Sequence, residues 1–425
     1  MLKVEKRNGN VVDFEQDKIK IAIEKAMKET DKGIDEEVSQ KIASEVFEEL
    51  KNKELVDIED IQDLVEFSLM KYRPEVAKKY ILYRQERTKL REKGWDMTAL
   101  QRDIYDKKYR YDGESFNDFL TRVSGGNEYI KKAIKDKKFM PAGRILAGRG
   151  LDKLGRKITL SNCYVMPKVE DSIESIFDTA KYLARTYSYG GGCGVNISKL
   201  RPKGARVNNA ALTTTGSVSF MDLFSLVTGL IGMRGRRGAL MLNMDSSHPD
   251  IEEFINVKND LDKVTYANIS VNVDDEFMKA VKNDTEYDLH FTVEANGQEI
   301  HKKVRAKELF EKLAYNNWND AEPGILFKDR IDSWHLMSEF DDFEFAGVNP
   351  CAEEPLPAFG SCNLSSINIS NFVKYPFKED AYFDFEDFKV AVKHGVRFLN
   401  GVLDENAELH PLKEQREVAK NLRQI

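Results

Sequence analysis

The sequence is poor in cysteine, with only Cys163, Cys193, Cys351 and Cys362 among 425 residues. Such sparse use argues against a disulfide scaffold and is typical of a reducing compartment, so we expect a cytoplasmic protein. The sequence contains no Cys-x-x-Cys pair and no Cys/His cluster, and its six histidines lack ligand spacing. A metal site is therefore not expected. Each cysteine is then either an inert buried side chain or a redox-active thiol.

An excess of positive charge and long apolar runs are also missing. The formal net charge is -7, whereas proteins that bind nucleic acid normally present a basic face. No apolar run approaches the length of about 20 residues that a transmembrane helix needs. The first residues are charged and have no apolar core of a secretory signal. We therefore expect neither nucleic acid nor a membrane as a partner, and anionic ligands must be held by local groups.

Residues 1–92 are predicted to form a separate block. An Asn8-Gly9-Asn10 turn between two short strands, 4–8 and 11–14, is typical of a hairpin. Helical periodicity follows over residues 17–29, 35–51, 58–70 and 74–92. The first helix has an apolar side and carries lysines on its opposite side, so the block can close a small core of its own.

From residue 93 onward, strand-like and helical segments alternate. The strand-like runs cover residues 161–166, 194–197, 239–244 and 267–273, and the clearest helical runs cover 173–187 and 220–231. This alternation predicts an α/β fold with a largely parallel sheet or barrel. Residues 286–305 are predicted to form a hairpin around Asn296-Gly297.

The segment Asn349-Pro350-Cys351-Ala352-Glu353 is the most informative part of the chain, and Cys362 follows eleven residues after Cys351. On an extended or tightly turned segment, a thiol and a carboxylate two positions apart can point at one substrate. The alternative is that Cys351 is a small buried hydrophobic residue.

Three further segments combine glycine with cations. They are residues 190–194 with Lys199 and Arg201, residues 232–238 with Arg234, Arg236 and Arg237, and Lys6, Arg7 and Gly9 with Lys18. Glycine lets backbone N–H groups approach a phosphate, and a nearby cation supplies the counter-charge. Each segment also has a structural alternative: a tight turn for the first, a solvated loop for the second and a basic solvent-facing hairpin for the third.

Over essentially its whole length the sequence resembles the large, catalytic subunit of ribonucleotide reductase. Four distant motifs occur in the expected order: Ser161-Asn162-Cys163, Gly191-Gly192-Cys193-Gly194-Val195-Asn196, Asn349-Pro350-Cys351-Ala352-Glu353 and Ser361-Cys362-Asn363-Leu364. The resemblance implies that residues 1–92 are a mostly helical ATP-cone that reads ATP against dATP. Residues 93–425 would be the reductase N-terminal region and the first half of a ten-stranded α/β barrel with a catalytic finger loop. The residues that match the cone are Val4, Lys6, Arg7, Gly9 and Lys18.

The resemblance also assigns roles at the active site. Cys351 would be the thiyl radical that removes the ribose 3′ hydrogen, Glu353 the general base for the 3′ hydroxyl, and Asn349 a hydrogen-bond partner of the ribose. The dithiol that supplies two electrons would be Cys163 and Cys362. Substrate would also be held by Asn162, Gly191 and Gly192.

The effector site implied by the resemblance lies at a homodimer interface and binds a deoxynucleoside triphosphate. Asp171 matches the acceptor for the effector's deoxyribose, and Arg201 matches a phosphate contact. Arg234, Arg236 and Arg237 match the loop that relays effector identity to substrate choice. Such coupling between two sites is typically worth about 1–3 kcal/mol.

The sequence leaves alternatives for the reductase subclass, for the completeness of the chain and for its function. Residues 235–239, 248–254 and 322–325 look most like the adenosylcobalamin-dependent class, the alternative being the class that receives its radical from a metal-containing partner subunit. Family members continue beyond the position of Ile425 into a second half-barrel, so we expect that half in trans or missing, and a thioredoxin-like reductant as a partner. The ribonucleotide substrate is a diphosphate or a triphosphate. The competing functions are a non-catalytic nucleotide-sensing fragment and a redox sensor.

Overall fold

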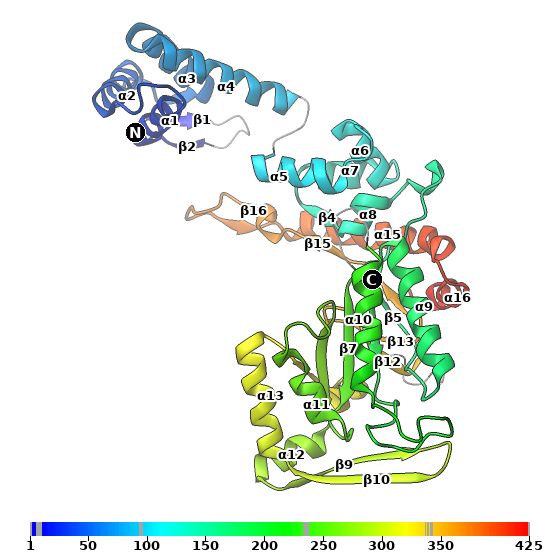
Figure 1. The fold of residues 1–425 in the computed structure, drawn as a ribbon. Helices are drawn as coiled ribbons and strands as arrows, with labels where there is room; N and C mark the ends of the chain where they lie inside the picture. The colour runs from blue at the N-terminus through cyan, green and yellow to red at the C-terminus, as the bar shows by residue number, and fades with distance from the viewer. Residues whose placement is uncertain are drawn as a thin grey trace. The chain divides into compact units, whose positions relative to one another are not determined.

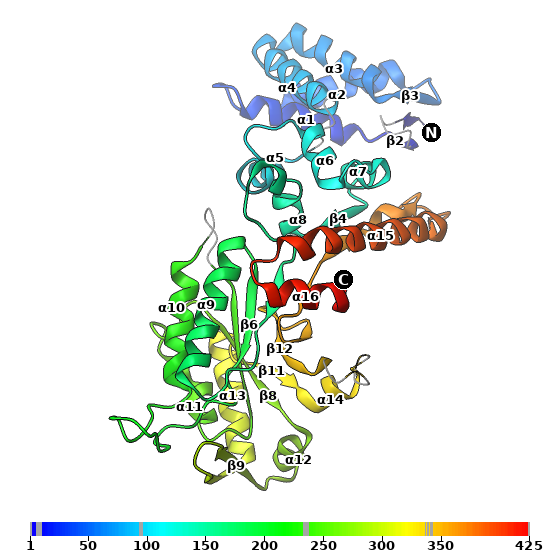
Figure 2. The same cartoon turned by 90° about the vertical axis from the view of Figure 1, so that its right-hand side faces the viewer.

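The computed structural model describes residues 2–5, 11–92, 97–232, 238–335, 337, 340 and 343–423. The chain divides into two compact units (Figures 1 and 2). The first consists of residues 1–107, 113–118 and 372–384, and the second of residues 108–112, 119–371 and 385–425. Within the described part, no helix is long and apolar enough to cross a membrane.

The first unit begins with a three-stranded sheet packed against helices. Strand β1 (Lys3–Glu5) pairs antiparallel with β2 (Val11–Asp13) and parallel with β3 (Leu55–Asp57). The helices are α1 (Gln16–Lys28), α2 (Glu36–Leu50), α3 (Ile58–Tyr72) and α4 (Pro74–Glu92). The four predicted helices and the antiparallel pairing of the first two strands are confirmed to within a few residues. Residues 6–8 of the first predicted strand and the predicted Asn8-Gly9-Asn10 turn lie outside the described residues. Strand β3, three residues between two helices, was not predicted.

The core of this unit is formed by side chains of residues 2–77, including Ile23, Met27, Ile42 and Leu69. Asp35 and Asp57 begin α2 and α3 by accepting hydrogen bonds from Val38 N and Glu59 N. The unit also contains α5 (Ala99–Ile104) and the paired strands β16 (Val373–Lys374) and β17 (Tyr382–Phe383).

The second unit is built on a curled six-stranded sheet with the order β11-β8-β7-β6-β5-β14, of which β6, β8 and β11 are labelled in Figure 2. The strands are β5 (Cys163–Val165), β6 (Gly192–Asn196), β7 (Leu240–Asp245), β8 (Asn268–Val273), β11 (Gly324–Phe327) and β14 (Ser361–Cys362). The first five are mutually parallel, and β14 pairs antiparallel with β5 at one edge. The predicted α/β half-barrel is confirmed, and the strands are almost wholly buried, as expected of a parallel sheet covered on both faces.

Helices cover the outer face of this sheet. They are α9 (Ile173–Tyr189), α10 (Met221–Leu230), α11 (Ile251–Asn256), α12 (Asp275–Asn283) and α13 (Ala306–Asp320). Leu183, Phe224, Phe254 and Leu313 bring these helices into one core with strand residues such as Leu242. The predicted hairpin is confirmed as β9 (Glu286–Val293) paired with β10 (Gln298–Arg305).

The finger hairpin packs on the sheet strands β5, β6 and β7. It consists of β12 (Phe345–Val348) and β13 (Pro355–Pro357), joined by residues 349–354, and β12 contacts all three sheet strands. The remaining elements of the unit are α7 (Glu128–Lys135), α8 (Gly143–Gly148), α14 (Lys328–Ser333), α15 (Phe385–Leu409), α16 (Lys413–Leu422) and the pair β4 (Phe139–Pro141) with β15 (Ser365–Ile367). Helix α6 spans Phe116–Ser124.

Candidate active site

Two buried thiols face each other across the edge of the sheet. The register of β5 and β14 places Cys163 directly opposite Cys362, and both are free cysteines. Cα atoms directly opposite in an antiparallel pair are about 4.5–5.5 Å apart. This separation lies within the range that a disulfide spans, so two residues far apart in sequence can form a bond with little backbone motion.

The two thiols differ in acidity. The Cys362 thiol, as a hydrogen-bond donor to the sulfur of Cys163, lowers the pKa of Cys163, and the same interaction raises the pKa of Cys362. The amide of Asn349 also lowers the pKa of Cys163, although its Nδ2 has no hydrogen bond of regular geometry. A proton therefore stays on Cys362, and Cys163 is the sulfur that more readily becomes a thiolate.

The finger loop is a tight turn organised by Asn349. Its carbonyl oxygen accepts a hydrogen bond from Ala352 N at 3.0 Å, and its Oδ1 accepts one from Glu354 N at 3.0 Å. Ala352 adopts the left-handed conformation, with φ of 65°. The turn leaves Cys351 and Glu353 exposed at its tip while Asn349 is fully buried.

Cys351 keeps its hydrogen at neutral pH. Partial burial raises the pKa of its thiol, and the negative charges of Glu353 and Cys163 raise it further. Cys163 lines the same cavity as Cys351, and Glu353 follows Cys351 by two residues. A protonated thiol beside a carboxylate suits hydrogen-atom transfer better than nucleophilic attack, which requires the thiolate.

Glycines in β6 let the finger approach the sheet. A Cβ on Gly194 would overlap the carbonyl oxygen of Val348 and lie 2.7 Å from its carbonyl carbon. A Cβ on Gly192 would lie 2.8 Å from the ring of Pro350. Asn268, at the start of β8, donates a hydrogen bond to the carbonyl of Pro350 at 3.1 Å, so the residue before Cys351 is held from two strands.

The backbone N–H groups of residues 190–193 donate hydrogen bonds to carbonyl groups within the fold. Gly191 N donates to the carbonyl of Thr186, and Gly192 N donates to that of Asn162. Gly190 ends α9 in the left-handed conformation, with φ of 96°. This segment therefore contributes space for the finger and a wall of the site, and these N–H groups are not a free phosphate cradle.

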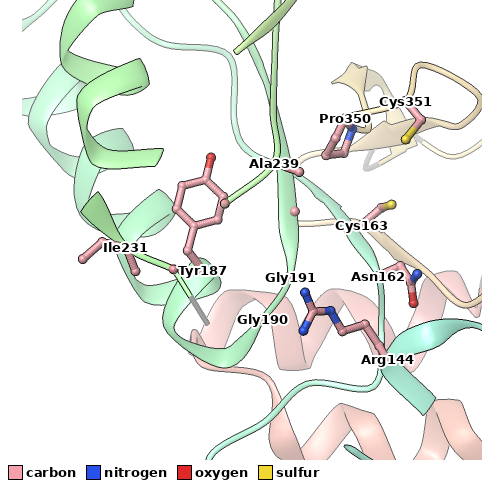
Figure 3. A pocket seen from close by; sticks show the side chains of 13 residues that line it. Arg144, Asn162, Cys163, Tyr187, Gly190, Gly191, Ile231, Ala239, Pro350 and Cys351 are labelled. Atoms are coloured by element: carbon pink, nitrogen blue, oxygen red, sulfur yellow. The ribbon is translucent and has the colours of Figure 1, made fainter. Parts of the chain in front are cut away.

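A cavity of about 230 Å³ brings the predicted substrate residues together (Figure 3). Its lining includes Asn162, Cys163, Gly191, Gly192 and Cys351. The Oδ1 atom of Asn162 is buried without a hydrogen-bond partner, which leaves an acceptor for a hydroxyl group.

Arg144, on the short helix α8, lines the same cavity and brings a cation to it. Arg144 could not be predicted from the sequence, because a single arginine outside any motif carries no signal. The same holds for Asn268.

The predicted effector residues Asp171 and Arg201 line a second cavity, of about 350 Å³. Arg201 donates to Asp171 from Nε at 2.7 Å and from its backbone N at 3.1 Å. Asp171 directly precedes Ser172, which caps α9 by accepting a hydrogen bond from Ser175 N. Residues 213–215 supply three threonines to the same cavity.

Of the other predicted nucleotide-binding residues, the structure describes Val4 and Lys18. Arg234, Arg236, Arg237, Lys6, Arg7 and Gly9 lie outside the described residues. Of the remaining cone residues, Val4 is buried in β1, and Lys18 is paired with Glu15 at 2.7 Å.

Comparisons with known proteins identify the family of the chain. Residues 161–425 match the family model described as ribonucleotide reductase, barrel domain, and residues 2–89 match the ATP cone domain. The chain is 32% identical to the vitamin B12-dependent ribonucleoside-diphosphate reductase of Thermoplasma acidophilum, over 99% of this chain and 65% of the relative. Identity to the protein of the same name from Mycobacterium tuberculosis is 31%, over 100% of this chain and 63% of the relative. The chain thus spans slightly less than two thirds of the length of these relatives.

A solved structure shows the same fold. The Actinobacillus ureae class Id ribonucleotide reductase alpha subunit superimposes with a TM-score of 0.58 at 19% identity, over 73% of this chain and 55% of that one. The half-barrel with its inserted finger and the matched barrel model place the chain among the α/β-barrel oxidoreductases. Since the barrel model covers more than half of the sequence, the chain belongs to the ribonucleotide reductase family, and it carries an N-terminal ATP-cone.

Proposed function

We propose that this chain provides the radical site of a ribonucleotide reductase that converts ribonucleotides to deoxyribonucleotides under nucleotide control. The observation that carries the proposal is the convergence of three cysteines. Cys163 and Cys362 face each other, and Cys351 lines the same cavity as Cys163. A nucleotide sensor or a two-thiol redox switch would need neither the third thiol nor the carboxylate of Glu353.

In the proposed reaction, a radical on Cys351 takes the 3′ hydrogen of the ribose while Glu353 accepts the proton of the 3′ hydroxyl. The 2′ hydroxyl then leaves as water with a proton from one of the facing thiols, and the other thiol supplies the hydrogen that the 2′ carbon gains. Cys163 and Cys362 thereby give up two electrons and form a disulfide. Glu353 returns its proton to the 3′ oxygen, and Cys351 returns its hydrogen to the 3′ carbon and becomes a radical again. An external dithiol of the thioredoxin type restores the pair by thiol–disulfide exchange.

Substrate binding follows from the cavity lining. In the proposal the unpartnered Oδ1 of Asn162 binds a ribose hydroxyl, and Arg144 supplies positive charge for a phosphate. Asn349 is fully buried directly before the lining residue Pro350, and its unpartnered Nδ2 is the second group proposed to bind the ribose. The names of the B12-dependent relatives favour a ribonucleoside diphosphate as substrate. The proposal requires the sugar of the substrate to occupy this cavity, because only then would the facing thiols lie below its 2′ position.

Adenosylcobalamin, the cofactor class of these relatives, would supply the radical that removes the hydrogen of the Cys351 thiol. The described residues fit this use, because Cys351 is exposed at the finger tip and its thiol keeps its hydrogen at neutral pH. The described residues contain no group of three or more His, Cys, Asp or Glu side chains that could hold a metal ion. This part of the chain would therefore present the hydrogen donor to the cofactor.

The described sheet is open, with β11 and β14 at its two edges. Cys351 is exposed at the finger tip, whereas radical chemistry needs a dry site. We therefore propose that a second half-barrel, supplied by a further segment or a second polypeptide, completes the site. The partners would then be that segment, a thioredoxin-like reductant and a second copy of the chain.

The test is an assay of deoxynucleotide formation from di- and triphosphates with adenosylcobalamin and a dithiol. The 425-residue chain is expected to be inactive alone and active when the second half-barrel of a related reductase is added. Turnover that requires a metal-containing radical subunit instead would assign the other class. Nucleotide binding without turnover in any mixture would support the nucleotide-sensing alternative.

The substitution Asp171→Asn is expected to weaken binding of a deoxynucleoside triphosphate effector about tenfold or more. It removes the charge that organises Arg201 and accepts the effector's hydroxyl, and hydrogen bonds to charged groups are worth about 1.5–3 kcal/mol. The measurement is calorimetric titration with dGTP and dTTP. Glu174→Gln, an exposed acidic residue in the first turn of α9, is the matched control and should leave affinity unchanged. Equal affinity of Asp171→Asn and the unmodified chain would rule out the assignment.

Residues 1–92 are expected to bind ATP or dATP when separated from the rest of the chain, because the buried core of this block closes within residues 2–77. Calorimetry on this fragment is the direct measurement, with GTP as the control for adenine recognition. An absence of heat at millimolar ATP and dATP from a folded fragment would show that this cone does not bind them.

A further inference from the structure

A buried asparagine on α15 connects to the segment that precedes Cys163. The Oδ1 atom of Asn406 accepts hydrogen bonds from Leu160 N at 2.7 Å and from Thr159 Oγ1 at 3.1 Å. Its Nδ2 donates to Ser161 Oγ at 2.6 Å. One side chain from a helix more than 240 residues away therefore holds three consecutive residues that lead into the active-site strand β5.

Ser161 carries this connection to the other redox strand. Its hydroxyl accepts the hydrogen bond from Asn406 and donates its single proton to Asn363 Oδ1 at 2.9 Å. Asn363 directly follows Cys362. The side chains of Asn406, Ser161 and Asn363 are all fully buried. The hydrogen bonds therefore connect α15, through Ser161, to Asn363. Ser161 lies two positions before Cys163, and Asn363 lies directly after Cys362.

The fourth hydrogen-bonding position of the Asn406 amide is also occupied. Its second N–H faces His410 Nε2 at 3.3 Å, and the His410 ring packs edge-on against Tyr164 at 5.3 Å. Burial, followed by the charge of Arg416, lowers the pKa of His410 to about 4, so the ring is neutral and can accept. Two acceptor and two donor positions of one side chain are thus all used, a set that neither aspartate nor leucine can reproduce.

We propose that Asn406 is a positioning residue that sets the spacing of the redox pair Cys163 and Cys362. This inference rests on the proposed function, in which these two thiols donate the electrons. Strand β14 has only two residues, too few for its backbone pairing with β5 to fix the separation of two side chains. The buried hydrogen bonds through Ser161 supply the missing constraint, because all four hydrogen-bonding positions of Asn406 are used, even though Asn363 Nδ2 and His410 Nδ1 at the ends of the network have no partner among the described residues.

The test is the thiol–disulfide equilibrium of this pair in the 425-residue chain, in a Cys351→Ala background that removes the exposed thiol. The chain is equilibrated with mixtures of reduced and oxidised dithiothreitol, and the Cys163–Cys362 disulfide is quantified by peptide mapping. Asn406→Asp and Asn406→Ala are expected to shift the equilibrium at least tenfold toward the dithiol, about 30 mV for a two-electron couple. The shift arises because thiols that are no longer held opposite each other meet less often.

Val402→Ala is the matched control, since Val402 is a buried apolar residue one turn earlier on α15. It should lower the free energy of unfolding in urea and leave the thiol–disulfide equilibrium unchanged. An equilibrium for Asn406→Asp within twofold of the background chain would overturn the inference, as would an equal shift in Val402→Ala. If the background chain forms no Cys163–Cys362 disulfide, the proposed function fails, and the inference fails with it.

Discussion

Deoxynucleotide formation is expected to fall below detection when Cys351 is replaced by serine in the reconstituted enzyme. Serine keeps the size and hydrogen bonding of the side chain and loses the weak S–H bond whose hydrogen the radical step moves. The exposed position of Cys351 at the tip of the finger means that little packing is lost. The free energy of unfolding and nucleotide affinity should therefore stay the same while turnover disappears.

Cys193→Ala is the control for this prediction. Its thiol is completely buried in the core between the sheet and the helices, and burial raises its pKa, so it is inert. We expect Cys193→Ala to retain turnover after the modest loss of stability that a small core truncation causes. Measurable turnover by Cys351→Ser would remove Cys351 from the reaction.

The substitution Gly194→Ala is expected to displace the finger and to reduce turnover by about 10²-fold or more, since a misplacement of roughly 1 Å can have that effect. The added methyl group would overlap the backbone of Val348, which cannot move away as a flexible side chain would. Forcing extra volume into a packed site also costs roughly 1–3 kcal/mol of stability. Urea denaturation and the turnover assay measure the two effects.

Gly401→Ala provides a matched glycine on α15. A Cβ at this position meets open space, and alanine is favoured over glycine in a helix by roughly 0.5–1 kcal/mol. This control should be as stable as the unmodified chain or slightly more stable, with normal turnover. Unchanged stability and turnover in Gly194→Ala would show that the finger does not pack on β6 as described.

The repeating β/α pattern made most of the fold predictable from sequence. Strands β5 to β8 and the helices α9 and α10 were found because their strand-like or helical patterns extend over four or more residues of sequence between turns, even where the strand itself is shorter, as in β5. Strands β3 and β14 were not found, since each has only two or three residues and forms through pairing with distant segments. The edge strand β14 matters most here, because it carries one of the two facing thiols.

The site was predictable where it lies in motifs and hidden where it depends on contacts between distant segments. The resemblance to a known family identified some of the residues that line the cavity, namely Asn162, Cys163, Gly191, Gly192 and Cys351. Asn268, Asn406 and Arg144 belong to no pattern, so only the folded chain shows what they contact. Glycine suits both a phosphate loop and a close approach of two backbones, and only the position of Val348 reveals that Gly194 serves the second purpose.

The most direct test of the central claim, that two facing thiols serve one radical cysteine, is the identity of the disulfide that this chain forms. Mild oxidation of the folded 425-residue chain, followed by alkylation and peptide mapping, gives the answer without any need for turnover. The account predicts one major intramolecular product that links Cys163 to Cys362, with Cys351 recovered as an alkylated thiol. A major product that links Cys351 to either of the other two, or recovery of Cys163 and Cys362 as free thiols, would contradict it.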